Sequence, residues 1–126
     1  MADRPSLVGS PGSEHVDVAV EVFRMLADAT RVHLLWHLLD GELSVNELAE
    51  AVDRPAASVS QHLAKLRLAR MVRTRRQGTQ IFYAIGDDHV QQLVRDAVHH
   101  AEHAVTDVPA HHRAANGNSR SEATSP

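Results

Sequence analysis

The stretch SVNELAEAVDRPAASVSQHLAKLR, residues 44–67, decides the fold of this chain. Ser44 with Glu47 three residues later has the pattern of a capping box, which predicts a helix that starts there. Asp53-Arg54-Pro55 then makes a short turn, and its proline favours the start of a second helix. The apolar residues of that second helix recur at i, i+4 and i+7, and they are Val59, Leu63 and Leu66. The stretch therefore predicts a helix-turn-helix with one buried stripe.

Two more helices are expected ahead of this stretch. The first ends near Asp28, and its apolar stripe consists of Val18, Val22, Met25 and Leu26. The segment RVHLLWHLL, residues 31–39, predicts the second. Thr30 is a plausible cap at its start, and Asp40-Gly41 a plausible end.

The segment after the stretch predicts a small sheet. MVRTRRQGTQIFYAI, residues 71–85, has the pattern of two short strands joined at Gln77-Gly78, where glycine accepts a positive φ. A long amphipathic helix from about residue 87 to 105 completes the chain. A helix-turn-helix followed at once by a basic hairpin predicts a winged helix, a mainly α fold with one helix for the major groove and a wing for the flanking backbone.

Length and composition indicate one domain without disulfides. The 126 residues fit a single domain, which we expect over residues 15–106. Residues 1–14 and 113–126 are rich in Gly, Pro, Ser and Asn, so we expect a disordered segment over residues 1–14 and a flexible, histidine-containing tail over residues 107–126. The absence of cysteine excludes thiolate metal ligands. Neither a signal peptide nor an apolar run of roughly 20 residues is present, which favours a cytoplasmic protein without a membrane partner.

Charge is distributed unevenly along the chain. The net charge is only −3, but residues 54–86 contain seven Lys or Arg and no Asp or Glu. Before Arg54, ten acidic residues face three arginines. A segment without carboxylates is the footprint expected of a site for a polyanion, and a merely solvated basic face is the alternative.

The residues expected to face DNA lie on the second helix of the motif and on the wing. Hydroxyls, amides and cations off the buried stripe suit phosphates and base edges. The alternative for Ser58 is a helix cap, and for His62 a half-buried packing role. The full set of candidates is Ser58, Ser60, Gln61, His62, Lys65, Arg67, Arg73, Arg75, Arg76, Thr79 and Gln80.

These motifs together resemble the ArsR/SmtB family of metal-responsive repressors. The resemblance covers roughly residues 17–106 and rests on LADATRVHLLWHL, ELSVNELAEAV, SVSQHLAKLR and RTRRQGTQIFYAI. It implies a homodimer, joined through the first and last helices, that holds operator DNA until an inducer metal lowers its affinity. Within the family, the histidine-rich end AEHA…HHRAA is most similar to nickel and cobalt sensors of the KmtR and NmtR types.

Three histidines of the last helix fall on one stripe. At 100° per residue, His100 lies about 20° from His89 and His103 about 40° to the other side. His89 and His100 are about 16 Å apart along one helix, so they cannot share a metal within one chain. Two helices packed antiparallel would bring Asp87 and His89 of one subunit to His100 and His103 of the other, giving two symmetric sites.

The family resemblance supports this location and adds other ligands. Asp87-x-His89 with His100-x-x-His103 is similar to the interhelical site of the family's zinc sensors. The KmtR type implies instead the positions His89, Glu102, His103, His111 and His112. Glu102 lies roughly 140° from His89, so it conflicts with the stripe unless the helix unwinds locally. Imidazole and carboxylate suit Zn²⁺, and also Ni²⁺ or Co²⁺ when further ligands are added.

The sequence therefore predicts a metal-sensing repressor of double-stranded operator DNA, with an imperfect palindrome as its target. One alternative keeps the winged helix but gives it a non-metal inducer. Another is a metal-storage protein or zinc hydrolase, but the chain lacks H-E-x-x-H, a nucleophile beside a base and a Gly-rich loop. We expect neither catalysis nor a small-molecule substrate.

Overall fold

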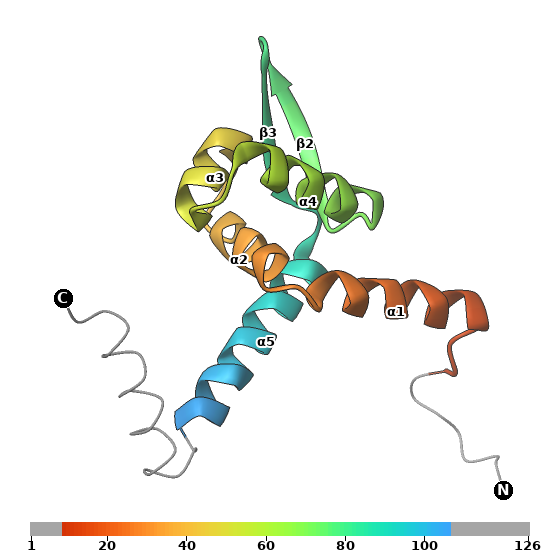
Figure 1. The fold of residues 1–126 in the computed structure, drawn as a ribbon. Coiled ribbons are helices and arrows are strands. Elements are labelled where there is room, and N and C mark those ends of the chain that lie inside the picture. The colour runs from red at the N-terminus through yellow and green to blue at the C-terminus, as the bar shows by residue number, and fades with distance from the viewer. Residues whose placement is uncertain (1–8, 107–126) are drawn as a thin grey trace, which may run out of the picture. The chain divides into compact units, whose positions relative to one another are not determined.

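The computed structural model describes residues 9–106, and the chain divides into two compact units after residue 92. The elements, in order, are α1 (Ser13–Leu26), α2 (Ala29–Leu38), β1 (Leu43–Ser44), α3 (Val45–Val52), α4 (Ala56–Leu68), β2 (Val72–Gln77), β3 (Gln80–Ile85) and α5 (Asp88–Thr106). Helix α5 starts in the first unit and continues into the second. In the first unit, the hairpin of β2 and β3 projects away from α3 and α4 (Figure 1). The predicted winged helix-turn-helix is confirmed.

Local sequence signals start the helices of the motif. Ser44 Oγ accepts from the Glu47 N–H at 3.2 Å, and Glu47 Oε1 accepts from the Ser44 N–H at 2.9 Å, which confirms the capping box. Pro55 is the N-cap of α4, as its fixed φ favours. Helix α1 begins at Ser13, two residues before the expected boundary of the domain.

The cap of α2 differs from the expectation. Asp28, and not Thr30, is the N-cap, because Asp28 Oδ1 accepts from the Arg31 N–H at 3.0 Å. Thr30 lies inside the helix. Both residue types cap helices well, and the one that the chain uses depends on the turn that joins α1 to α2.

The sheet has one strand more than the sequence predicts. Its order is β1-β3-β2, all antiparallel, with Leu43 opposite Tyr83 and Val72 opposite Ile85. The two-residue β1 leads directly into α3, so it ties the wing to the start of the helix-turn-helix. The hairpin loop is Gly78-Thr79, one residue later than expected, and Gly78 has a φ of 64°.

The core of the first unit lies under the recognition helix α4. Val59, Leu63 and Leu66 are 0% exposed, which confirms the predicted stripe. The other buried apolar residues of this unit comprise four leucines and four residues of the wing and its flanks; they are Leu34, Leu35, Leu38, Leu48, Met71, Val72, Ala84 and Val90. This packing fixes which side of α4 is left for solvent. In the second unit, Val94 of α5 is 1% exposed.

Candidate DNA interface and metal ligands

The outer face of α4 carries most of the polar residues expected to meet DNA. Since Val59, Leu63 and Leu66 take the inner face, the positions between them point outward. Ser58 is half-buried, and the exposed candidates are Ser60, Gln61, Lys65 and Arg67. The N-cap of α4 is Pro55, which makes no side-chain hydrogen bond, and Ser58 lies inside the helix as its third residue. The helix can therefore offer an amide, hydroxyls and two cations to a groove.

His62 departs from this arrangement. Its side chain is 21% exposed, and its Nδ1 lies 3.5 Å from Arg31 Nη1 and 4.0 Å from Asp28 Oδ1. The imidazole is therefore turned toward the start of α2 and away from the outer face of α4. The packing role, given above as the alternative for His62, describes this placement.

Arg75 of the wing is held by a carboxylate. Its guanidinium donates to Glu42 through Nε at 3.0 Å and through Nη2 at 2.8 Å, and it lies 5.0 Å from the centre of the Phe82 ring. The hydrogen bonds from Arg75 lower the pKa of the Glu42 carboxyl below its usual value, and the same bonds raise the pKa of Arg75. A phosphate would have to compete with Glu42 for this guanidinium.

The remaining wing candidates are exposed. Arg73 Nε donates to the Ile85 carbonyl at 3.1 Å, across the hairpin, which leaves the rest of its guanidinium accessible. Arg76, Thr79 and Gln80 lie at or beside the hairpin turn and are exposed. Within residues 9–106, no ion pair of Arg76 is found, so it is the wing cation most available to a phosphate.

The side-chain partners of His62 and Arg75 were not predicted from the sequence. Arg31 is buried beside His62, and Glu42 binds Arg75 from 33 residues away. The only sequence signal for the Arg31–His62 contact was an arginine inside an apolar helix segment. An arginine that is buried there needs hydrogen-bond acceptors from other parts of the fold. The Glu42–Arg75 contact had no local signal, because its two residues meet through the pairing of β1 with β3 and β3 with β2.

The histidines of α5 are exposed on an unbroken helix. His89, His100 and His103 are all exposed. Helix α5 runs without a break from Asp88 to Thr106, so it continues past Glu102 without the unwinding that this residue would need to join the histidine stripe. Thr106 Oγ1 donates to the Glu102 carbonyl at 2.9 Å. Asp87 caps α5, because its Oδ1 accepts from the Val90 N–H at 2.9 Å. Two further candidates, His111 and His112, lie outside the described residues.

Residues 9–106 bring together no three His, Asp or Glu side chains able to hold a metal. His89 and His100 are eleven positions apart on α5, about 16 Å along the helix, so they cannot share an ion within one chain. The donor set itself fits: exposed imidazoles with a neighbouring carboxylate are ligands for borderline divalent ions. Asp87 would keep one oxygen for its cap and have the other for such an ion.

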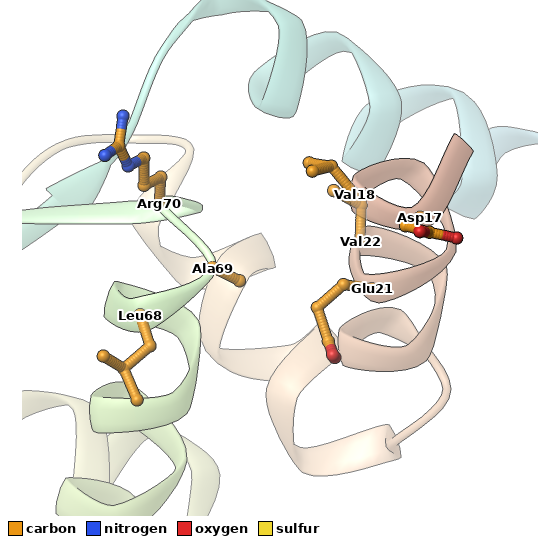
Figure 2. A pocket seen from close by; sticks show the side chains of 7 residues that line it. All are labelled: Asp17, Val18, Glu21, Val22, Leu68, Ala69 and Arg70. Atoms are coloured by element: carbon orange, nitrogen blue, oxygen red, sulfur yellow. The ribbon is translucent and has the colours of Figure 1, made fainter. Parts of the chain in front are cut away.

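Helix α1 leaves an apolar surface uncovered. None of its 14 residues is buried, and Val18 and Phe23 are each 63% exposed. A groove of about 510 Å³ runs between α1 and the end of α4, with Val18 and Val22 on one side and Leu68 and Ala69 on the other (Figure 2). Leu68, on the last turn of α4, is 86% exposed. An apolar surface of this kind is typical of an interface.

No helix within residues 9–106 combines the length and the apolar character needed to cross a membrane.

Comparison with known proteins places the chain in a family. The family described as "Bacterial regulatory protein, arsR family" matches residues 28–74. The HTH-type transcriptional regulator KmtR of Mycobacterium tuberculosis is 67% identical over 104 residues, which are 82% of this chain and 80% of KmtR. The HTH-type transcriptional repressor SmtB of the same organism is 36% identical over 100 residues, 79% of this chain and 74% of SmtB.

Solved structures agree with the sequence relatives. The homodimeric winged helix-turn-helix DNA-binding domain of Mb0332 from Mycobacterium bovis, a possible ArsR-family transcriptional regulator, has a TM-score of 0.70 and 25% identity, over 83% of this chain and 98% of that one. The fold, the matched segment and the identity to KmtR over four-fifths of both proteins lead to one conclusion. This chain belongs to the ArsR family of bacterial regulatory proteins and carries their DNA-binding winged helix-turn-helix.

Proposed function

We propose that this protein is a metal-sensing transcriptional repressor that binds operator DNA as a homodimer and releases it when metal binds the paired α5 helices. The observation that carries the sensing half is the unbroken α5 with His89, His100 and His103 exposed on one stripe. The repressor half is supported by similarity to SmtB, which is named a transcriptional repressor. The protein acts by binding and not by catalysis, in the cytoplasm where its DNA target is.

A second copy of the chain is the proposed occupant of the α1 surface. Val18 and Leu68 are exposed and line the groove beside α1, and Phe23 is exposed on the same helix; exposed apolar residues that gather in this way mark an interaction site. Similarity to a winged helix domain described as homodimeric supports this choice of occupant. We infer a two-fold symmetric dimer through α1 and α5, which sets the spacing of the two recognition helices on an imperfect palindrome.

The DNA-binding surface in this proposal is the outer face of α4 with the tip of the wing. Gln61 and the serines suit base edges and phosphates, and the cations suit phosphates. Arg75 and His62 have other partners, so they are not assigned direct contacts here. The proposed contacts are Ser58, Ser60, Gln61, Lys65, Arg67, Arg73, Arg76, Thr79 and Gln80.

The proposed metal site joins Asp87 and His89 of one subunit to His100 and His103 of the other. The bound ion would supply bonds that hold the two α5 helices in one relative arrangement. Nickel or cobalt is the preferred inducer, because the histidine-rich end of the chain resembles that of nickel and cobalt sensors, and zinc is the alternative. Glu102, His111 and His112 remain candidate additional ligands for the six-coordinate ions.

The test is DNA release by metal. The probe is the duplex that the wild-type protein selects from a random-sequence library, with binding followed by fluorescence anisotropy at fixed salt. His89→Ala with His103→Ala should bind the duplex as wild type does but fail to release it in Ni²⁺, Co²⁺ or Zn²⁺. His99→Ala is the matched control, because His99 is exposed on α5 but off the stripe, and it should respond normally. Release of the double variant at wild-type metal concentrations would contradict the proposal.

A further inference from the structure

The start of α2 holds a buried arginine that connects two helices. Arg31 is 9% exposed as a residue, and its Nε donates to the Met25 carbonyl at 2.8 Å while Nη2 donates to the Arg24 carbonyl at 3.2 Å. These carbonyls belong to the last turn of α1, where helical carbonyls lack their usual i+4 partners, and the Arg24 carbonyl accepts in addition from the Ala27 N–H at 3.2 Å. One guanidinium therefore caps the end of α1 from inside the fold.

The same guanidinium reaches the recognition helix. Arg31 Nη1 lies 3.5 Å from His62 Nδ1, and Asp28 lies beside both, with its carboxylate oxygens 4.0 Å from Arg31 Nη1 and from His62 Nδ1. A guanidinium has donors only, so this contact is a hydrogen bond when His62 Nδ1 is the acceptor and the imidazole proton is on Nε2. The contact joins α4 to the corner of α1 and α2 through a directed bond.

The residues that α4 buries in the core are apolar. Val59, Leu63 and Leu66 set which side of the helix faces the core. The Arg31–His62 contact adds a directional polar contact, because hydrogen bonds weaken steeply away from linear geometry. A small rotation of α4 that the apolar stripe tolerates would break this contact and would shift the exposed Gln61, which is proposed to read a base edge.

We propose that Arg31 and His62 form a positioning pair, which sets the angle of the recognition helix against the end of α1, and that His62 serves DNA recognition in this way without touching DNA. This inference rests on the proposed function, because it concerns the affinity for operator DNA. It also gives a physical route between α1, at the proposed dimer surface, and α4. The chemistry requires only an acceptor at position 62 and a forked donor at position 31.

Two variants test whether position 62 needs only a hydrogen-bond acceptor or the imidazole itself. His62→Gln keeps an acceptor oxygen, and His62→Leu removes it at similar size. His62→Leu should bind the selected duplex about tenfold more weakly than wild type. This is at the low end of the loss expected for a hydrogen bond to a charged group, because the Arg31–His62 contact is long. His62→Gln should stay within about twofold of wild type. Affinity for a random duplex and the salt dependence should not change in either variant, because no cation is lost.

A second variant, at position 31, tests the pairing even if His62→Leu fails to fold. Arg31→Lys keeps a charge for the α1 carbonyls but has no fork to reach His62, so it should lose operator affinity to the same extent as His62→Leu. Combined, the two changes should cost no more than either alone, which is the sign of one shared contact. The proposal is overturned by full operator affinity in His62→Leu, by equal losses in His62→Gln and His62→Leu, or by additive losses in the double variant. Failure of the wild type to select any duplex would instead overturn the proposed function.

Discussion

Glu42 is predicted to restrain the binding of DNA by the wing. Its carboxylate occupies the Arg75 guanidinium through hydrogen bonds of 2.8 to 3.0 Å, so this cation is neutralised before DNA arrives. Glu42→Gln keeps the shape of the side chain and removes the charge. Because the pair is exposed, we expect little change in stability and a clear change in the binding of a polyanion.

The size of the change follows from the number of cations released. A dimer contains two Glu42–Arg75 pairs, and each additional phosphate contact steepens the dependence of log K on log salt by about 0.9. Glu42→Gln should therefore steepen the slope by about 1.8. Between about 50 and 200 mM salt, where log salt changes by about 0.6, the variant should lose roughly tenfold more affinity than wild type loses.

The assay is anisotropy of a labelled duplex at several salt concentrations, with two arginine variants as controls. Arg75→Gln in the wild-type background should leave the slope almost unchanged, because Arg75 is already paired. Arg76→Gln should reduce the slope by about 1.8 per dimer, because that cation has no ion-pair partner among residues 9–106. A wild-type slope in Glu42→Gln, together with a reduced slope in Arg75→Gln, would show that Arg75 binds phosphate despite Glu42, and would refute this reasoning.

Three further predictions concern the cap, the dimer and the response to pH. Ser44→Ala should cost about 1 kcal/mol in urea unfolding, because it removes one half of the capping box, and an unchanged midpoint would contradict that role. Leu68→Glu should leave the monomer as stable as before but weaken dimerisation at least tenfold, because it places a charge in the proposed interface. Sedimentation equilibrium measures the dimerisation constant, and an unchanged constant would exclude Leu68 from the interface. The hydrogen bond from the Arg31 N–H lowers the pKa of Asp28 in the folded protein below the ordinary value of 3.8. The Asp28 carboxylate therefore stabilises the fold at pH values above 3.8, and this stabilisation is lost as the pH falls through the lowered pKa of the folded protein. Asp28→Asn keeps the cap, so its melting temperature should fall less steeply with acid than that of wild type, and parallel curves would argue against this assignment.

The sequence was sufficient where a signal was local. The capping box at Ser44 and Glu47 lies within one turn, and the stripe Val59, Leu63 and Leu66 depends only on helix periodicity. Both were predicted correctly, and so was the hairpin that follows. These features identify a winged helix because the order of the elements, more than any one motif, defines that fold.

The sequence was insufficient where residues far apart in the chain meet. Strand β1 has two residues and exists only through its pairing with β3. The same pairing lets Glu42 reach Arg75, and the corner of α1 and α2 turns His62 toward Arg31. Propensity and periodicity carry no information about such contacts, which is why the side-chain partners of His62 and Arg75 were not predicted.

The metal ligands depend on a second copy of the chain. Helix geometry alone places His89, His100 and His103 on one stripe, and it shows that one subunit cannot close the site. The continuous helix through Glu102 keeps this residue off the stripe. The identity of the partner's ligands therefore remains a prediction from symmetry and from family resemblance.

In the proposed mechanism, metal and DNA oppose each other on one dimer. Linkage requires that the factor by which nickel weakens DNA binding equals the factor by which DNA weakens nickel binding. The most direct measurement is the nickel affinity of the full-length dimer, free and saturated with the selected duplex, by competition with a chelator of known affinity. Nickel should bind the DNA-bound dimer about 5- to 150-fold more weakly than the free dimer. The variant with both His89→Ala and His103→Ala should show no such difference. Equal nickel affinities of the free and the DNA-bound wild-type dimer would contradict the proposed mechanism.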